Sequence, residues 1–130
     1  MSNKILKHEH LIIRALLENP PKCPTAIKFW MENLVETIDM KILMGPYAVY
    51  SHMPGNMGLT AVTIIETSHI ALHIWDEVSP ALMQLDVYTC SDLEIDRVFQ
   101  EIKQFSPSKL EYKYIDREND LTLLKKGSIL

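Results

Sequence analysis

Cysteine is scarce in this sequence, which has only Cys23 and Cys90, far apart in the chain. Two distant cysteines do not suggest the disulfide framework of a small secreted domain. The chain also lacks an apolar leader that would resemble a signal peptide. We therefore expect a protein of the reducing cytoplasm.

Basic residues and long apolar runs are also in short supply. Lysine and arginine total 13 against 17 acidic residues, for a net charge of -4, whereas nucleic-acid binding needs a basic patch. The apolar run over residues 11–17 is interrupted by Arg14 and is shorter than the roughly 20 residues of a membrane-spanning helix. We expect neither a nucleic-acid nor a membrane partner, which leaves a small molecule or another protein.

The apolar residues that are present suffice for one core. The chain has 130 residues, 47% of them hydrophobic, and an ordinary domain runs on the order of 100 to 150 residues. Residues 1–130 are therefore predicted to form a single domain.

Apolar periodicity predicts two helices and six strands. Helical spacing begins after Pro24 and Thr25 and continues over residues 27–38, and it returns over residues 93–105 after a candidate cap at Ser91 and Asp92. Branched and alternating apolar residues predict strands, which are bounded by Pro, Gly, Asn and Ser. These strand ranges are 10–17, 41–50, 58–65, 70–75, 82–89 and 110–115.

The order of these elements predicts the fold class. One strand, a helix, four strands, a helix and a last strand favour an α+β two-layer sandwich, with an antiparallel-rich sheet and both helices packed on one face. The other face would then need a partner. The polar start of residues 118–130 predicts a tail that is ordered only in part and carries no function.

The informative segment runs from residue 58 to residue 90. Polar landmarks occur in it in a fixed order: Thr67-Ser68-His69, then His73, then Asp76-Glu77 after a tryptophan, and finally a strand that ends in Cys90. Alone, a Thr-Ser-His tripeptide is usually a polar turn, and a lone cysteine is usually a small buried residue. Together the landmarks resemble the prokaryotic S-adenosylmethionine decarboxylase proenzymes, which are pyruvoyl-dependent.

The resemblance implies a self-cleaving chain. Ser68 would attack the carbonyl of Thr67 and convert that peptide bond into an ester, whose elimination leaves a pyruvoyl group at position 68. The products would be a β chain of residues 1–67 and an α chain of residues 68–130. Thr60, Thr67 and His73 correspond to the positions that support this processing.

The resemblance also implies roles in turnover. The covalent pyruvoyl group made from Ser68 would take the place of pyridoxal phosphate in decarboxylating an amino-acid-type substrate. Cys90 corresponds to the proton donor, while Glu77, and with it Glu66, is assigned to substrate binding. The family reaction makes the aminopropyl donor for spermidine synthesis, and relatives act as homodimers of cleaved protomers.

Strand geometry limits two interpretations. A span of four residues on a strand is about 13 Å, so His69 and His73 cannot share one metal ion. His8 and His10 have no third ligand nearby in the sequence. We therefore predict no metal site. The same rise keeps His73 away from Ser68 unless the chain bends or other partners assist. We therefore predict a sharp turn at Thr67 and Ser68.

Two departures from the family pattern leave the efficiency of processing and the identity of the substrate open. Thr67 stands where relatives usually have Glu, and no aromatic residue lies between His52 and Trp75 to stack on adenine. One alternative is therefore a pyruvoyl-dependent ornithine or arginine decarboxylase. The other is an unprocessed, non-catalytic homologue that regulates a decarboxylase.

Overall fold

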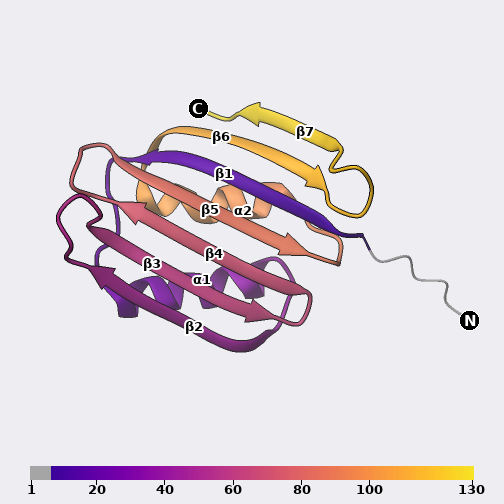
Figure 1. The fold of residues 1–130 in the computed structure, drawn as a ribbon, viewed down its shortest axis with the longest axis horizontal. Helices are drawn as coiled ribbons and strands as arrows, with labels where there is room; N and C mark the ends of the chain where they lie inside the picture. The colour runs from indigo at the N-terminus through magenta and orange to yellow at the C-terminus, as the bar shows by residue number, and fades with distance from the viewer. Residues whose placement is uncertain (1–6) are drawn as a thin grey trace, which may run out of the picture.

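The computed structural model describes residues 7–130, which form one seven-stranded sheet and two α-helices (Figure 1). In chain order the elements are β1 (Glu9–Leu17), α1 (Pro24–Thr37), β2 (Ile42–Ser51), β3 (Gly58–Ile65), β4 (Ser68–Trp75), β5 (Ala81–Thr89), α2 (Ile95–Ile102), a short 3-10 helix (Lys103–Phe105), β6 (Pro107–Asp116) and β7 (Leu123–Ser128).

The sheet is antiparallel throughout, in the order β2-β3-β4-β5-β1-β6-β7. Both helices lie behind it in Figure 1, so they cover the same face. The predicted α+β two-layer sandwich is confirmed. No helix of the described residues is long and apolar enough to cross a membrane.

Alternation along the strands separates a covered face from an open one. In β1, Leu11, Ile13 and Ala15 are buried, whereas the intervening Ile12 and Arg14 are exposed. Successive strand residues point to opposite faces, so the buried set packs against the helices. The core therefore fills the space between sheet and helices.

The open face is rich in apolar side chains. On its β2 and β3 side, between 40% and 61% of each side chain is exposed for Met44, Tyr47, Val49, Val62 and Ile64. An exposed apolar patch of this kind is typical of a protein interaction surface.

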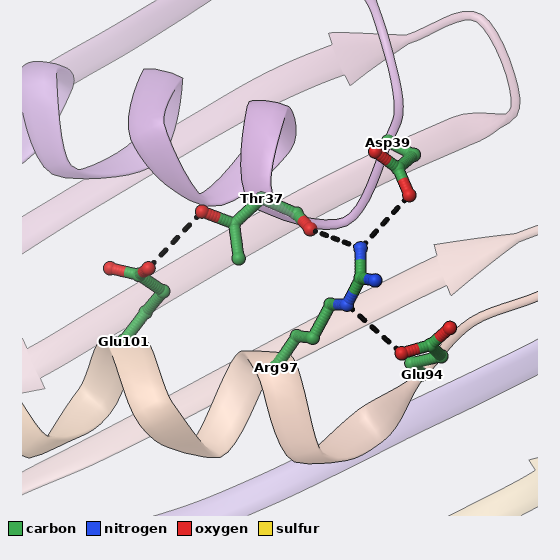
Figure 2. Close-up of polar contacts among 5 residues, drawn as sticks. All are labelled: Thr37, Asp39, Glu94, Arg97 and Glu101. Atoms are coloured by element: carbon green, nitrogen blue, oxygen red, sulfur yellow. Dashed lines mark hydrogen bonds and ion pairs between the residues drawn. The ribbon is translucent and has the colours of Figure 1, made fainter.

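Polar contacts join the C-terminal end of α1 to the side of α2, as Figure 2 shows. Arg97 donates to the Thr37 carbonyl and to Asp39, both across 2.9 Å, and it pairs with Glu94. Glu101 accepts a hydrogen bond from the Thr37 hydroxyl. The predicted cap of α2 was wrong: its N-cap is Glu94, without a side-chain cap hydrogen bond, and not Ser91 or Asp92.

The C-terminal tail contains a strand that the sequence did not predict. β7 pairs with β6 and extends the sheet to its edge. All six of its residues are exposed. Without a buried face, the strand does not need the alternation of apolar and polar residues from which a strand is predicted. The expectation of a tail ordered only in part is corrected accordingly.

Candidate active site

The Thr67–Ser68 peptide bond lies at the tip of the β3–β4 hairpin. Ile65, the last residue of β3, pairs with Ser68, the first residue of β4, so Glu66 and Thr67 alone form the turn. The N–H of Glu66 donates to the Lys41 carbonyl across 2.9 Å, which fixes the turn against the chain before β2. A sharp turn is present as predicted, but it consists of Glu66 and Thr67, and Ser68 already belongs to β4, so the turn does not bring His73 closer to Ser68.

Ser68 has an unusual backbone conformation. Its φ is 145°, a positive value that side-chain-bearing residues rarely adopt and that costs about 1–3 kcal/mol. The neighbouring β5 strand pairs Thr89 with Ser68 and so holds it from the other side. Local strain is therefore concentrated at the residue that is expected to react.

The carbonyl of Thr67 is engaged by the backbone of Cys90. The Cys90 N–H donates a hydrogen bond to the Thr67 oxygen across 2.9 Å. A donor on a carbonyl oxygen polarises the carbon and stabilises the oxyanion that forms when a nucleophile adds. Sequence reasoning selected Cys90 for its thiol and missed this contact, because backbone donors leave no signal in residue type.

A second polar group lies on the open face of the hairpin. Thr60 and His73 are paired across β3 and β4, and the Thr60 hydroxyl lies 3.2 Å from Nδ1 of His73. The Trp75 ring stacks near the imidazole, with ring centroids 5.9 Å apart. The hydroxyl and histidine expected to support processing thus contact each other.

The structure does not bring this pair to Ser68. β4 runs from Ser68 to Trp75 with unbroken pairing on both sides, so His73 lies five residues, or about 16 Å, along the strand. His73 also belongs to the open face, whereas Ser68 pairs with Ile65 and Thr89, both buried on the covered side. Within one chain the two parts of the expected machinery stay apart.

Glu77 belongs to the His73 end of the hairpin. Its carboxylate accepts a hydrogen bond from the N–H of Met57 across 3.0 Å. The adjacent Asp76 accepts one from the Tyr50 hydroxyl at 2.8 Å, and this bond, with burial and the charge of Asp76, raises the pKa of Tyr50. By contrast, Glu66 is exposed in the turn beside Ser68.

A small cavity of about 250 Å³ lies over the middle of the open face. His73 lines it together with Arg14, Gln84 and Asp86 from the neighbouring strands. Beyond Asp86, His10 and His69 approach the same carboxylate. Sequence reasoning assigned no role to His10 or Asp86, because β1, β4 and β5 bring them together only in the folded sheet.

Comparison with known proteins agrees with these features. The sequence profile of the S-adenosylmethionine decarboxylase family matches residues 7–118. The S-adenosylmethionine decarboxylase proenzyme of Pyrobaculum arsenaticum is 38% identical over 64 residues, which are 48% of this chain and 50% of that protein. The proenzyme of the same name from Methanococcus maripaludis is 35% identical over 71 residues, covering 53% and 57%.

The chain is also similar to an arginine decarboxylase proenzyme and to a solved structure. The arginine decarboxylase proenzyme of Aeropyrum pernix is 30% identical over 76 residues, which are 56% of each chain. The chain thus matches only about half of the length of these curated relatives. The crystal structure of the adenosylmethionine decarboxylase of Aquifex aeolicus superposes with a TM-score of 0.70 at 23% identity, over 88% of this chain and 92% of that one, and so shares its fold.

Proposed function

Since the chain belongs to the S-adenosylmethionine decarboxylase family, we propose that it is a proenzyme that cleaves itself between Thr67 and Ser68 and then decarboxylates S-adenosylmethionine. The product would be the aminopropyl donor used to make spermidine. The curated relatives from Pyrobaculum arsenaticum and Methanococcus maripaludis, both of which are S-adenosylmethionine decarboxylase proenzymes, support this substrate.

The contact between the Thr67 carbonyl and the Cys90 N–H carries the proposal. Addition of the Ser68 hydroxyl to the Thr67 carbon places negative charge on the oxygen that Cys90 already contacts. Collapse then breaks the bond to the Ser68 nitrogen and leaves an ester. The positive φ of Ser68 favours reaction, because breaking the chain releases the strain.

The second stage removes the ester. Elimination frees Thr67 as a carboxylate, and hydrolysis with loss of ammonia leaves the pyruvoyl group on residue 68. When present, this group supplies an electron-accepting carbonyl next to the substrate amine, the chemistry that pyridoxal phosphate supplies elsewhere. Cys90, beside the cleavage point and with a free thiol, is the proposed proton donor, because a thiol can give a proton near neutral pH.

A second copy of the chain would complete the site. Thr60 and His73 cannot serve Ser68 of their own chain, about 16 Å away along β4, and the apolar open face needs a cover. A two-fold axis that crosses β4 between the two open faces would invert the strand direction and bring the partner's His73 to the Ser68 end of β4, against the open-face side of the Thr67–Ser68 peptide bond. We therefore include a face-to-face homodimer in the proposal, with Glu77 meeting substrate beside the partner's Ser68.

A basic amino acid is the second candidate substrate. The Aeropyrum pernix relative is an arginine decarboxylase proenzyme, and the loop before Gly58 offers no aromatic ring for adenine. Feeding S-adenosylmethionine, arginine and ornithine separately to cleaved protein, and measuring the carbon dioxide released, decides among them. Release from arginine or ornithine alone would overturn the S-adenosylmethionine assignment.

Intact mass spectrometry of the denatured, freshly purified chain tests the cleavage itself. We expect two fragments that meet after Thr67, with residues 68–130 lighter than the unmodified peptide by one ammonia. Ser68→Ala should stay in one piece, whereas Ser91→Ala, a nearby serine outside the hairpin, should cleave normally. A wild-type chain that stays intact would instead support a non-catalytic regulatory homologue.

A further inference from the structure

Three potential metal ligands converge on the open face from three adjacent strands. His10 lies on β1, Asp86 on β5 and His69 on β4, and β5 lies between the other two. The Nε2 atoms of His10 and His69 lie 3.1 Å and 3.5 Å from the same Asp86 oxygen. We propose that these side chains bind a divalent transition-metal cation of the zinc type.

The distances suit such an ion. Zinc binds imidazole nitrogen and carboxylate oxygen at about 2.0–2.2 Å, which sets neighbouring ligand atoms of a tetrahedron about 3.3 Å apart. The two separations from the Asp86 oxygen, 3.1 Å and 3.5 Å, bracket this value, and all three ligand atoms lie within 4.8 Å of one another. Small side-chain rotations are enough to close the set.

The surroundings hold the two imidazoles in position. Tyr88 pairs with both His10 and His69 in the sheet, and its ring centroid lies 5.5 Å from each imidazole. All three ligand residues are half-buried. A ligand set whose orientations are fixed before binding loses less conformational freedom when the ion arrives.

The cationic side chain of Arg117 lies beside the cluster. The guanidinium of Arg117 lies 3.9 Å from the centre of the Tyr88 ring and 3.4 Å from Nδ1 of His10. A donor at Nδ1 keeps the imidazole proton on Nε2, the atom that must bind the ion. Metal binding therefore requires that proton to move to Nδ1 and exposed Arg117 to swing away.

The ligand types and the neighbouring charge predict which ion binds and how its affinity can be changed. Imidazole ligands favour zinc, cobalt and nickel, whereas magnesium prefers oxygen ligands and water. Replacing Arg117 with glutamine takes away a repelling charge and shortens the side chain that donates to His10. Arg117→Gln should therefore bind zinc more tightly than the natural chain.

Calorimetric titration of the untagged, full-length chain with zinc chloride is the direct test, with cobalt absorption spectra as a second measurement. We expect one ion per chain, and His10→Gln, His69→Gln and Asp86→Asn should each weaken binding at least about tenfold. His52→Gln, a histidine outside the cluster, is the matched control and should bind like wild type. Circular dichroism checks that each variant is folded.

The same titration on Ser68→Ala separates the metal site from self-cleavage, since an uncleaved chain retains all three ligands and should bind equally. Absence of zinc binding to the folded wild-type chain would overturn the site. Binding that survives unchanged in the three ligand variants would overturn it as well. If a ligand variant misfolds, the zinc affinity of Arg117→Gln becomes the deciding measurement. Zinc binding by Arg117→Gln that is equal to or weaker than that of the natural chain contradicts the proposal.

Discussion

The backbone N–H of Cys90 donates to the carbonyl oxygen of Thr67 across 2.9 Å, so the residue proposed to donate the proton in turnover also contacts the peptide bond proposed to break. Under the proposed function one residue would serve both stages with different atoms. The backbone contact would act in processing, and the thiol would act in decarboxylation. The two contributions are separable by substitution.

Substitutions at Cys90 should separate cleavage from turnover. Cys90→Ala keeps the N–H, so we expect normal cleavage but little decarboxylation. Cys90→Pro removes the donor and should slow cleavage by about 10²–10³-fold, the usual cost of losing one oxyanion donor. Timed mass spectra of freshly folded protein measure the rate, with circular dichroism as the folding control. Equal cleavage of the two variants would contradict a role for this hydrogen bond.

Mixed dimers should reveal whether His73 acts across the interface. Ser68→Ala and His73→Ala chains are each expected to stay largely intact alone. Co-expressed, they form dimers in which the Ser68→Ala chain supplies His73 to the intact Ser68 of its partner. The His73→Ala chain, marked by a mass tag, should then be cleaved. If it stays intact in isolated mixed dimers, His73 does not act in trans.

Gly58 should tolerate no side chain. Its φ is +145°, and an added Cβ would overlap the Ile74 carbonyl on β4. Gly58→Ala should lower the free energy of unfolding by about 3 kcal/mol or more, because backbone must shift. Gly55→Ala is the control: its φ is +87° but nothing lies within 4 Å of the added atom. Urea denaturation compares the two, and equal losses would refute the steric explanation.

Tyr114 should make stability fall at alkaline pH. Burial, and then the 2.6 Å hydrogen bond to Glu9, raise the pKa of its phenol. Because the pKa of Tyr114 is raised in the folded state, its contribution to the free energy of unfolding is complete below the ordinary tyrosine pKa of about 10. That contribution is lost as pH rises from there through the folded-state pKa. Urea midpoints from about pH 8 to pH 11 should fall less steeply in Tyr114→Phe than in wild type. Exposed Tyr47→Phe is the control and should follow wild type.

Much of the fold was predictable because burial is one-sided. Leu11, Ile13 and Ala15 alternate with exposed residues in β1, and a period of two is what a half-covered sheet imposes on a sequence. β7 was not predictable, since none of its side chains is buried. The cap of α2 was misplaced because Glu94 makes no side-chain cap bond that a sequence preference could reflect.

The candidate site was predictable where it is local. The turn before Ser68 follows from adjacent strand patterns, and the pairing of Thr60 with His73 follows from the same hairpin. The Cys90 contact and the approach of His10 to Asp86 depend on the order of strands in the complete sheet. The residues within one strand do not indicate which other strands will lie beside it. Strand rise indicated that a straight β4 would separate His73 from Ser68, but the bend expected to overcome that distance is absent between them.

The strand order also determines what a cut after Thr67 would leave behind. Residues 1–67 contain β1, β2 and β3, and residues 68–130 contain the other four strands. In the sheet, β1 lies between β5 and β6, while β4 lies between β3 and β5. The strands of the two fragments are therefore interleaved. Separating the fragments would break the hydrogen bonds of three strand pairs, β3–β4, β5–β1 and β1–β6. The cleaved protein would therefore persist as one particle, yet once denatured it would refold at a rate that depends on its concentration.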